Sequence, residues 1–111
     1  MLSSNLNRGF TLTFENNLTI SVQFGTGNYC ERREFYKGYA DDLKEHNTKS
    51  LNAEIAIWDE TVASKGSDYW YDFGHDKVKG WCSADEVAEW IHAVQTATSL
   101  ETIVAPKERV E

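Results

Sequence analysis

Residues 80–97 read GWCSADEVAEWIHAVQTA, and this stretch decides the fold because both its beginning and its buried face can be predicted. Ser83 and Glu86 have the spacing of a capping box, in which each side chain accepts a hydrogen bond from the backbone amide of the other residue. A helix is therefore predicted to begin at Ala84.

Apolar side chains recur along this helix at the i, i+3, i+4, i+7 spacing that collects them on one face. They are Val87, Trp90, Ile91 and Val94. One amphipathic helix cannot bury such a face by itself, so the rest of the chain has to supply a flat apolar surface.

Two stretches ahead of the helix alternate between apolar and polar residues, as half-buried β-strands do. They are residues 10–14 (FTLTF) and 18–24 (LTISVQF). A three-residue loop between them pairs Phe14 with Leu18 and keeps both apolar sets on one face, whereas a two-residue turn would oppose core and solvent faces. Asn17 then takes a left-handed backbone conformation, which asparagine tolerates.

Residues 51–59 and 68–73 also alternate, and they are predicted to be the third and fourth strands. Together the segments predict an α+β fold, with an antiparallel sheet of about four strands (two hairpins) and one C-terminal amphipathic helix packed across one face. In the fourth strand Trp70 would point away from the helix, and three aromatic side chains would face it: Tyr69, Tyr71 and Phe73.

The length of 111 residues fits a single small domain, residues 1–111. Residues 1–9 and 105–111 are mostly polar or charged and are expected to fray. Residues 31–50 are expected to form a variable excursion, within which residues 31–46 are either a short helix or an ordered loop.

Charge is distributed unevenly along the chain. Residues 1–50 hold equal numbers of acidic and basic side chains, so residues 51–111 carry the whole net charge of −7. A surface of this sign repels phosphate backbones and argues against direct binding of DNA or RNA. It suits a partner with a basic surface, although an excess of acid also keeps small proteins soluble. The sequence has no membrane-spanning stretch and no export signal, so we expect a cytoplasmic protein.

Four residues have side chains that zinc prefers: Cys30, His75, Cys82 and His92. Zinc sites usually draw on close pairs such as CxxC, and these residues are too widely spaced for that pattern. We therefore expect no metal and no cofactor. The two cysteines should be thiols rather than a disulfide, and Cys82 beside Trp81 is typical of packing.

The best catalytic candidate is His75, which adjoins Asp76 in a predicted bend and lies near Asp72. A carboxylate that orients a histidine is a common acid–base arrangement. No nucleophile accompanies the group in a recognised motif, and ordinary turn residues at the surface explain it equally well. A small enzyme around His75 is therefore an alternative to a binding protein.

A second alternative is a small-ligand binder, for example a sponge for signalling nucleotides. Gly25, Gly27, Arg32 and Arg33 would contact phosphate, while aromatic rings would stack on the base. The glycine spacing matches neither the GxGxxG nor the GxxxxGK motif and is more typical of a turn.

Tryptophans and carboxylates in the third and fourth predicted strands point most directly to a function. If the helix covers one face of the sheet, Trp58 and Trp70 project together on the other, unless residues 31–46 fold over them. Aromatic anchors with a charged rim are typical of protein–protein interfaces. The predicted partner-binding residues are Glu54, Trp58, Asp59, Glu60, Asp68, Trp70, Asp72 and Asp76.

Four segments, which together make up about one third of the chain, resemble a family of small proteins encoded by tailed bacteriophages and prophages. They are FTLTFENNLTISVQFG (residues 10–25), NYC (28–30), AEIAIWD (53–59) and WCSADEVAEWI (81–91). The resemblance implies a setting more than a chemistry, namely an early or accessory phage protein made in the host bacterial cytosol. Small acidic phage proteins are often inhibitors of host defence, including anti-CRISPR and anti-restriction proteins, and some imitate the charge of nucleic acid. The leading hypothesis is a protein that blocks a basic host nuclease or surveillance complex, and a homodimer is compatible with it.

Overall fold

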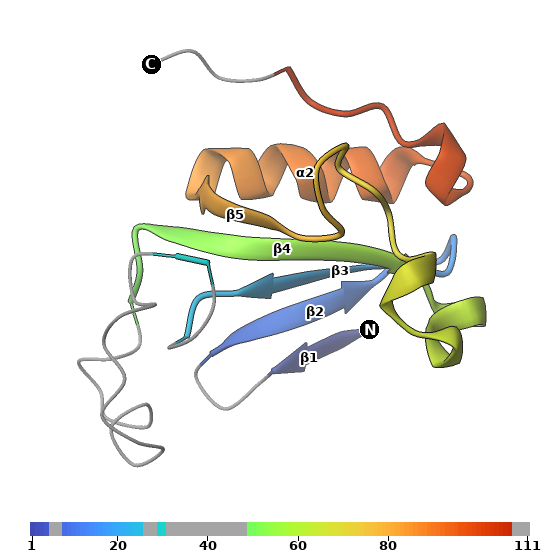
Figure 1. Ribbon diagram of the computed structural model, residues 1–111, viewed down its shortest axis with the longest axis horizontal. Coiled ribbons are helices and arrows are strands. Elements are labelled where there is room, and N and C mark those ends of the chain that lie inside the picture. Colours follow the sequence, from blue (N-terminus) through green and yellow to red (C-terminus); the bar gives the residue numbers. More distant parts are fainter. Residues whose placement is uncertain (5–7, 26–28, 31–48, 108–111) are drawn as a thin grey trace.

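The computed structural model describes residues 1–4, 8–25, 29–30 and 49–107, and it consists of one sheet with one main helix packed on it (Figure 1). The sheet is antiparallel with the order β1-β2-β3-β4-β5, so each strand pairs with its neighbours along the chain. The predicted α+β fold is confirmed, with five strands instead of about four. The strands are β1 (Leu2–Ser4), β2 (Gly9–Thr13), β3 (Leu18–Gln23), β4 (Asn52–Asp59) and β5 (Lys79–Ser83). The helices are α2 (Ala84–Thr96) and the short 3-10 helices η2 (Glu60–Lys65), η3 (Ser67–Tyr69) and η4 (Leu100–Thr102).

The β2–β3 hairpin has the register that its alternation predicted. Phe10 pairs with Val22, and the amide of Phe14 donates to the carbonyl of Leu18 at 3.0 Å. Asn17 adopts a φ of 67°, the left-handed conformation expected of the third loop residue. Both strands therefore direct their apolar side chains to the same face.

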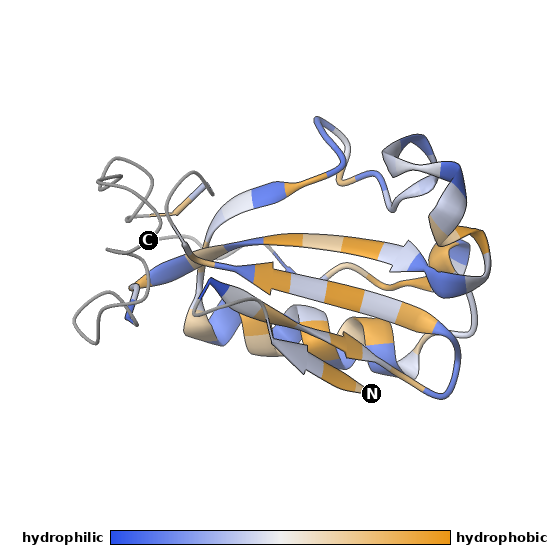
Figure 2. Cartoon of the chain, turned by 90° about the horizontal axis from the view of Figure 1, so that it is seen from below, coloured by the Kyte–Doolittle hydropathy of each residue, from blue (hydrophilic) through white to orange (hydrophobic). Residues whose placement is uncertain are grey.

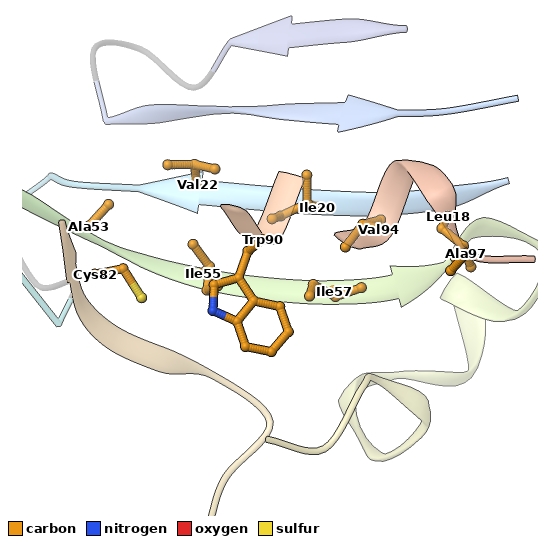
Figure 3. Close-up of a cluster of buried hydrophobic side chains, with 10 residues drawn as sticks. All are labelled: Leu18, Ile20, Val22, Ala53, Ile55, Ile57, Cys82, Trp90, Val94 and Ala97. Atoms are coloured by element: carbon orange, nitrogen blue, oxygen red, sulfur yellow. The ribbon is translucent and has the colours of Figure 1, made fainter. Parts of the chain in front are cut away.

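The core lies between α2 and this apolar face, and Figure 2 shows apolar and polar residues alternating along the strands in front of the helix. Within the predicted helix stripe Trp90 and Val94 are buried, whereas Val87 and Ile91 are half-buried because the helix packs mainly on β3, β4 and β5. The buried cluster in Figure 3 consists of Leu18, Ile20, Val22, Ala53, Ile55, Ile57, Cys82, Trp90, Val94 and Ala97.

The predicted capping box at the start of α2 is confirmed. The Ser83 hydroxyl accepts from the Glu86 amide at 3.2 Å, and the Ser83 amide donates to Glu86 Oε1 at 3.1 Å. Two amides at the beginning of the helix are thereby paired, and the helix begins at Ala84 as expected.

Replacing Ser83 with alanine should lower the free energy of unfolding by about 1 kcal/mol, because the Glu86 amide loses its acceptor. Chemical denaturation of the variant measures this loss. Ser3→Ala, in the exposed strand β1, is the matched control and should change stability by less than about 0.5 kcal/mol. Equal unfolding midpoints for the two variants would contradict a stabilising role for the cap.

The other end of α2 is held by a residue that lies far away in the sequence. Asn16 Nδ2 donates to the carbonyls of Val94 at 2.9 Å, Gln95 at 3.3 Å and Ala97 at 2.7 Å. Asn16 Oδ1 accepts from the amide of Leu18 at 3.0 Å. Carbonyls at the end of a helix lack partners within the helix. The β2–β3 turn therefore supplies them and ties the sheet to α2.

The prediction of a strand over residues 68–73 is wrong. Ser67–Tyr69 is the 3-10 helix η3, and the amide of Tyr71 then donates to the carbonyl of Ile57 at 2.8 Å. On the edge of β4 that β3 leaves open, β5 takes the place predicted for this segment and pairs with Asn52, Ala53 and Ile55. The segment after η3 thus passes beside the C-terminal half of β4 without continuing the ladder.

The N-terminus, expected to fray, is also different. Leu2–Ser4 forms β1, which pairs with β2, and the amino group of Met1 donates to the carbonyl of Thr13 at 2.6 Å. The predictions for residues 31–46 fall outside the described residues, as do those for most of 31–50. In the part of the chain that the structure describes, no helix is both long and apolar enough to span a bilayer.

Candidate functional site

The predicted partner-binding residues centre on a pair of stacked indoles. The ring centroids of Trp58 on β4 and Trp70 just after η3 are 5.0 Å apart, with an interplanar angle of 27°. Trp58 pairs with Thr19 of β3 and alternates with the buried Ile57, so the stack lies on the sheet face opposite α2. Both indoles are half-buried.

Glu60 fixes the orientation of the Trp58 ring. Its Oε1 accepts from Trp58 Nε1 at 2.8 Å and from the hydroxyl of Thr19 at 2.8 Å. Thr19 is buried, and its hydroxyl lies 2.8 Å from that of Thr13 on β2. This network joins three strands to the first residue of η2, so the indole is oriented before any partner binds.

Trp70 is positioned by the aromatic residues that follow it. Tyr71 and Phe73 pack edge-on against Trp90 of α2, with centroid distances of 5.9 Å and 5.1 Å. Because successive side chains of an extended segment point to opposite sides, Trp70 turns away from the helix and meets Trp58. The predicted division between the two faces therefore holds for Trp70, Tyr71 and Phe73 although the segment is not a strand, whereas the prediction that Tyr69 faces the helix is wrong.

Two large aromatic side chains are exposed, and one of them, Tyr69, was predicted to face the helix. Tyr69 on η3 is 54% exposed, and Lys65 Nζ lies 5.4 Å from its ring centroid. Trp81 is also 54% exposed. A bulge where β5 passes Glu54 gives Trp81 a φ of 57°, and such bulges re-aim side chains.

Three carboxylates lie close to the stack in the chain. Glu60 contacts Trp58 directly. Asp59 begins η2 by accepting from the amide of Thr61 at 2.9 Å and from its hydroxyl at 2.7 Å. Asp68 is exposed and makes no hydrogen bond or ion pair with a described residue. We call Trp58, Trp70, Asp59, Glu60 and Asp68 the aromatic–acidic surface.

The other three predicted acids mainly contact backbone amides or a lysine. Glu54, near the start of β4, accepts from the amide of Tyr29 at 3.0 Å. Asp72 forms an ion pair of 3.9 Å with Lys77, which neutralises part of its charge. Asp76 accepts from the amide of Lys77 at 2.7 Å.

His75 is exposed and has no hydrogen-bond partner among the described residues. The neighbouring Asp72 and Asp76 direct carboxylate oxygens to backbone amides of the bend instead of to the imidazole. The carboxylate–histidine pair on which the catalytic alternative depends is therefore not formed.

The candidate zinc ligands are separated between the interior and the surface. Cys30 and Cys82 are buried free thiols, whereas His75 and His92 are exposed. Within residues 1–4, 8–25, 29–30 and 49–107, no group of three or more His, Cys, Asp or Glu side chains is arranged to hold a metal ion.

Of the alternative ligand-binding residues, Gly27, Arg32 and Arg33 lie outside the described residues. Gly25 is buried against Arg8, and a Cβ at this position would lie 2.6 Å from Arg8 Cγ. Its carbonyl accepts from the thiol of Cys30 at 3.6 Å. Gly25 thus packs against the protein itself, which does not favour a phosphate-binding role.

No protein-family model, curated protein or solved structure matches the chain.

Proposed function

We propose that this chain is a non-catalytic binding protein whose aromatic–acidic surface engages a basic surface on another protein. The observation that carries the proposal is the Trp58–Trp70 stack, in which Glu60 holds the Trp58 ring in one orientation and which lies near the exposed Asp68 in the chain. Tryptophan is enriched among the residues that dominate binding energy at protein interfaces. A stack that is already oriented loses little rotamer entropy when a partner binds.

The sign of the charge supports a basic partner. Residues 51–111, which supply every residue of the aromatic–acidic surface, carry the whole net charge of −7. Complementary charge accelerates association, and salt screens this effect. The same charge disfavours a nucleic-acid ligand, because phosphate groups would be repelled.

The resemblance to small phage proteins supports a narrower form of the proposal. In this form the chain is a bacteriophage accessory protein that acts in the host cytosol and inhibits a basic host defence protein, as anti-CRISPR and anti-restriction proteins do. The partner is then a nuclease or a surveillance complex, and the acidic surface competes with the nucleic acid that this partner binds.

Binding is tested with purified protein against a panel of restriction nucleases and CRISPR surveillance complexes, by biolayer interferometry at low and high salt. Trp70→Ala should weaken the interaction by about thirtyfold or more, the loss typical of a central aromatic residue. Asp68→Asn should slow association and reduce the dependence of affinity on salt, because it removes an exposed charge.

Trp81→Ala is the matched control, because it removes an exposed indole that lies on β5 and outside the aromatic–acidic surface. It should bind as the wild type does. Thermal unfolding verifies that both tryptophan variants are folded. An equal loss of affinity for Trp81→Ala and Trp70→Ala, or affinity that is the same at low and high salt, would overturn the proposal.

A further inference from the structure

A separate candidate site is an apolar cavity of about 570 Å³ at the end of the core where α2 begins. Val87 in the first turns of the helix lines one side, and Phe10 and Val22 of the sheet line the other. Figure 3 shows Val22 and Cys82, both of which line the cavity, at this end of the buried cluster. The cavity lies on the helix side of the sheet, whereas the aromatic–acidic surface lies on the opposite side.

The cavity is open because α2 does not cover the whole apolar face. The helix packs mainly on β3, β4 and β5, so Phe10 of β2 is only half-buried although its side chain belongs to the apolar face. Phe24, which follows β3, is half-buried as well and also lines the cavity. Apolar walls and a volume within the range of roughly 300–1,000 Å³ are typical of small-molecule sites.

One edge of the cavity is polar. Among the described residues Lys49 is the one charged side chain that lines it, and none of their carboxylates pairs with its ammonium group. The hydroxyl of the adjacent Ser50 is already engaged, since it donates to the carbonyl of Asn52 at 2.7 Å. The ammonium group of Lys49 is therefore the charged donor that this edge offers to a ligand, in a chain whose net charge is −7.

From this combination we propose that the cavity binds a small fatty-acid-like amphiphile. The hydrocarbon part of the ligand lies against Phe10, Phe24 and Val87, where its transfer from water is favourable. Its carboxylate pairs with the ammonium group of Lys49, a charge-assisted contact that a neutral ligand cannot make. The inference rests on the cavity and on Lys49, and it does not depend on the partner-binding function.

The test uses three ligands with the same alkyl chain: decanoate, decanol and decyltrimethylammonium. The two ionic ligands are titrated into the full chain below their critical micelle concentrations and decanol below its solubility limit, and binding is measured by isothermal titration calorimetry. Decanoate should bind about tenfold more tightly than decanol, and the cationic ligand should bind most weakly. Lys49→Gln should remove the advantage of decanoate while leaving the affinity for decanol unchanged.

Filling the cavity is the second arm of the test. Val87→Trp should abolish binding of all three ligands. If this variant does not fold, Ala84→Phe replaces it, because Ala84 is exposed at the edge of the cavity and a phenyl ring there should block the same space. Lys107→Gln controls for the loss of one positive charge elsewhere and should bind as the wild type does. Equal affinities for decanoate and decanol, no effect of Lys49→Gln, or undiminished binding in a folded cavity-filling variant would each overturn the proposal. The proposal would also be overturned if two copies of the chain buried the cavity between them in a dimer that none of the three ligands dissociates.

Discussion

Replacing Asn16 with alanine is expected to lower the free energy of unfolding by about 2–3 kcal/mol, a large loss for a residue in a turn. The substitution removes three hydrogen bonds to carbonyls at the end of α2 and one from the amide of Leu18. The helix end and the β2–β3 turn are then no longer joined, and half-buried polar groups are left to compete for water. Urea denaturation measures the change through the unfolding midpoint at constant slope.

Asn16→Asp separates the two roles of this side chain. The carboxylate still accepts from the amide of Leu18, but it points an anionic oxygen at the negative end of the α2 dipole. It should therefore be at least as destabilising as alanine. Asn17→Asp, at the next position, is the control, because aspartate also tolerates the left-handed backbone and should cost less than about 0.5 kcal/mol. A wild-type midpoint for Asn16→Asp would mean that the bond to Leu18 alone accounts for the role of Asn16.

Features that depend on neighbouring residues were predictable from the sequence. The alternation of apolar and polar residues along residues 10–24 determines the hairpin register. The three-residue separation of Ser83 and Glu86 determines where α2 begins. The placement of Trp58 and Trp70 on one face follows from the same two-residue period. It survives the absence of a fourth strand at residues 68–73, because alternation requires only an extended backbone and not a ladder of hydrogen bonds.

Features that depend on distant partners were not predictable. Whether β5 or residues 68–73 pairs with β4 is decided by competition for one strand edge, and both segments contain suitable aromatic residues. The bulge that turns Trp81 outward depends on how β5 meets β4. The contact between Asn16 and Ala97 spans most of the chain. No local pattern reports any of these.

The candidate sites differ in the same way. The residues of the aromatic–acidic surface could be predicted from the amino acids of two segments. The roles of its acids could not, because they depend on hydrogen bonds formed in the fold: Asp59 caps η2 and Glu60 orients Trp58. The apolar cavity was missed altogether. Its walls come from four strands, a helix and the residues before β4, and the only local signal is Lys49 ahead of an alternating stretch.

Trp90→Ala is expected to lower the free energy of unfolding by about 3–5 kcal/mol, the usual cost of removing a large aromatic side chain from a core. Trp90 is 7% exposed, and the rings of Tyr71 and Phe73 pack against it. The same contacts position Trp70 on the far side of the sheet. The variant should therefore also disturb the Trp58–Trp70 stack, although this stack lies on the sheet face opposite α2.

Two measurements on one sample distinguish the loss of stability from the loss of the stack. Denaturation gives the free energy, and circular dichroism of the folded protein at low temperature reports the exciton coupling of the two stacked indoles. Trp90→Phe keeps an aromatic ring in the core and should retain the coupling at a cost of about 1 kcal/mol. If Trp90→Ala does not fold, Phe73→Leu removes one of the two intermediate rings with a smaller change in volume. Exciton coupling that persists at full strength in a folded but destabilised variant would show that Glu60 alone orders the stack, and the proposed dependence of the aromatic–acidic surface on helix packing would be wrong.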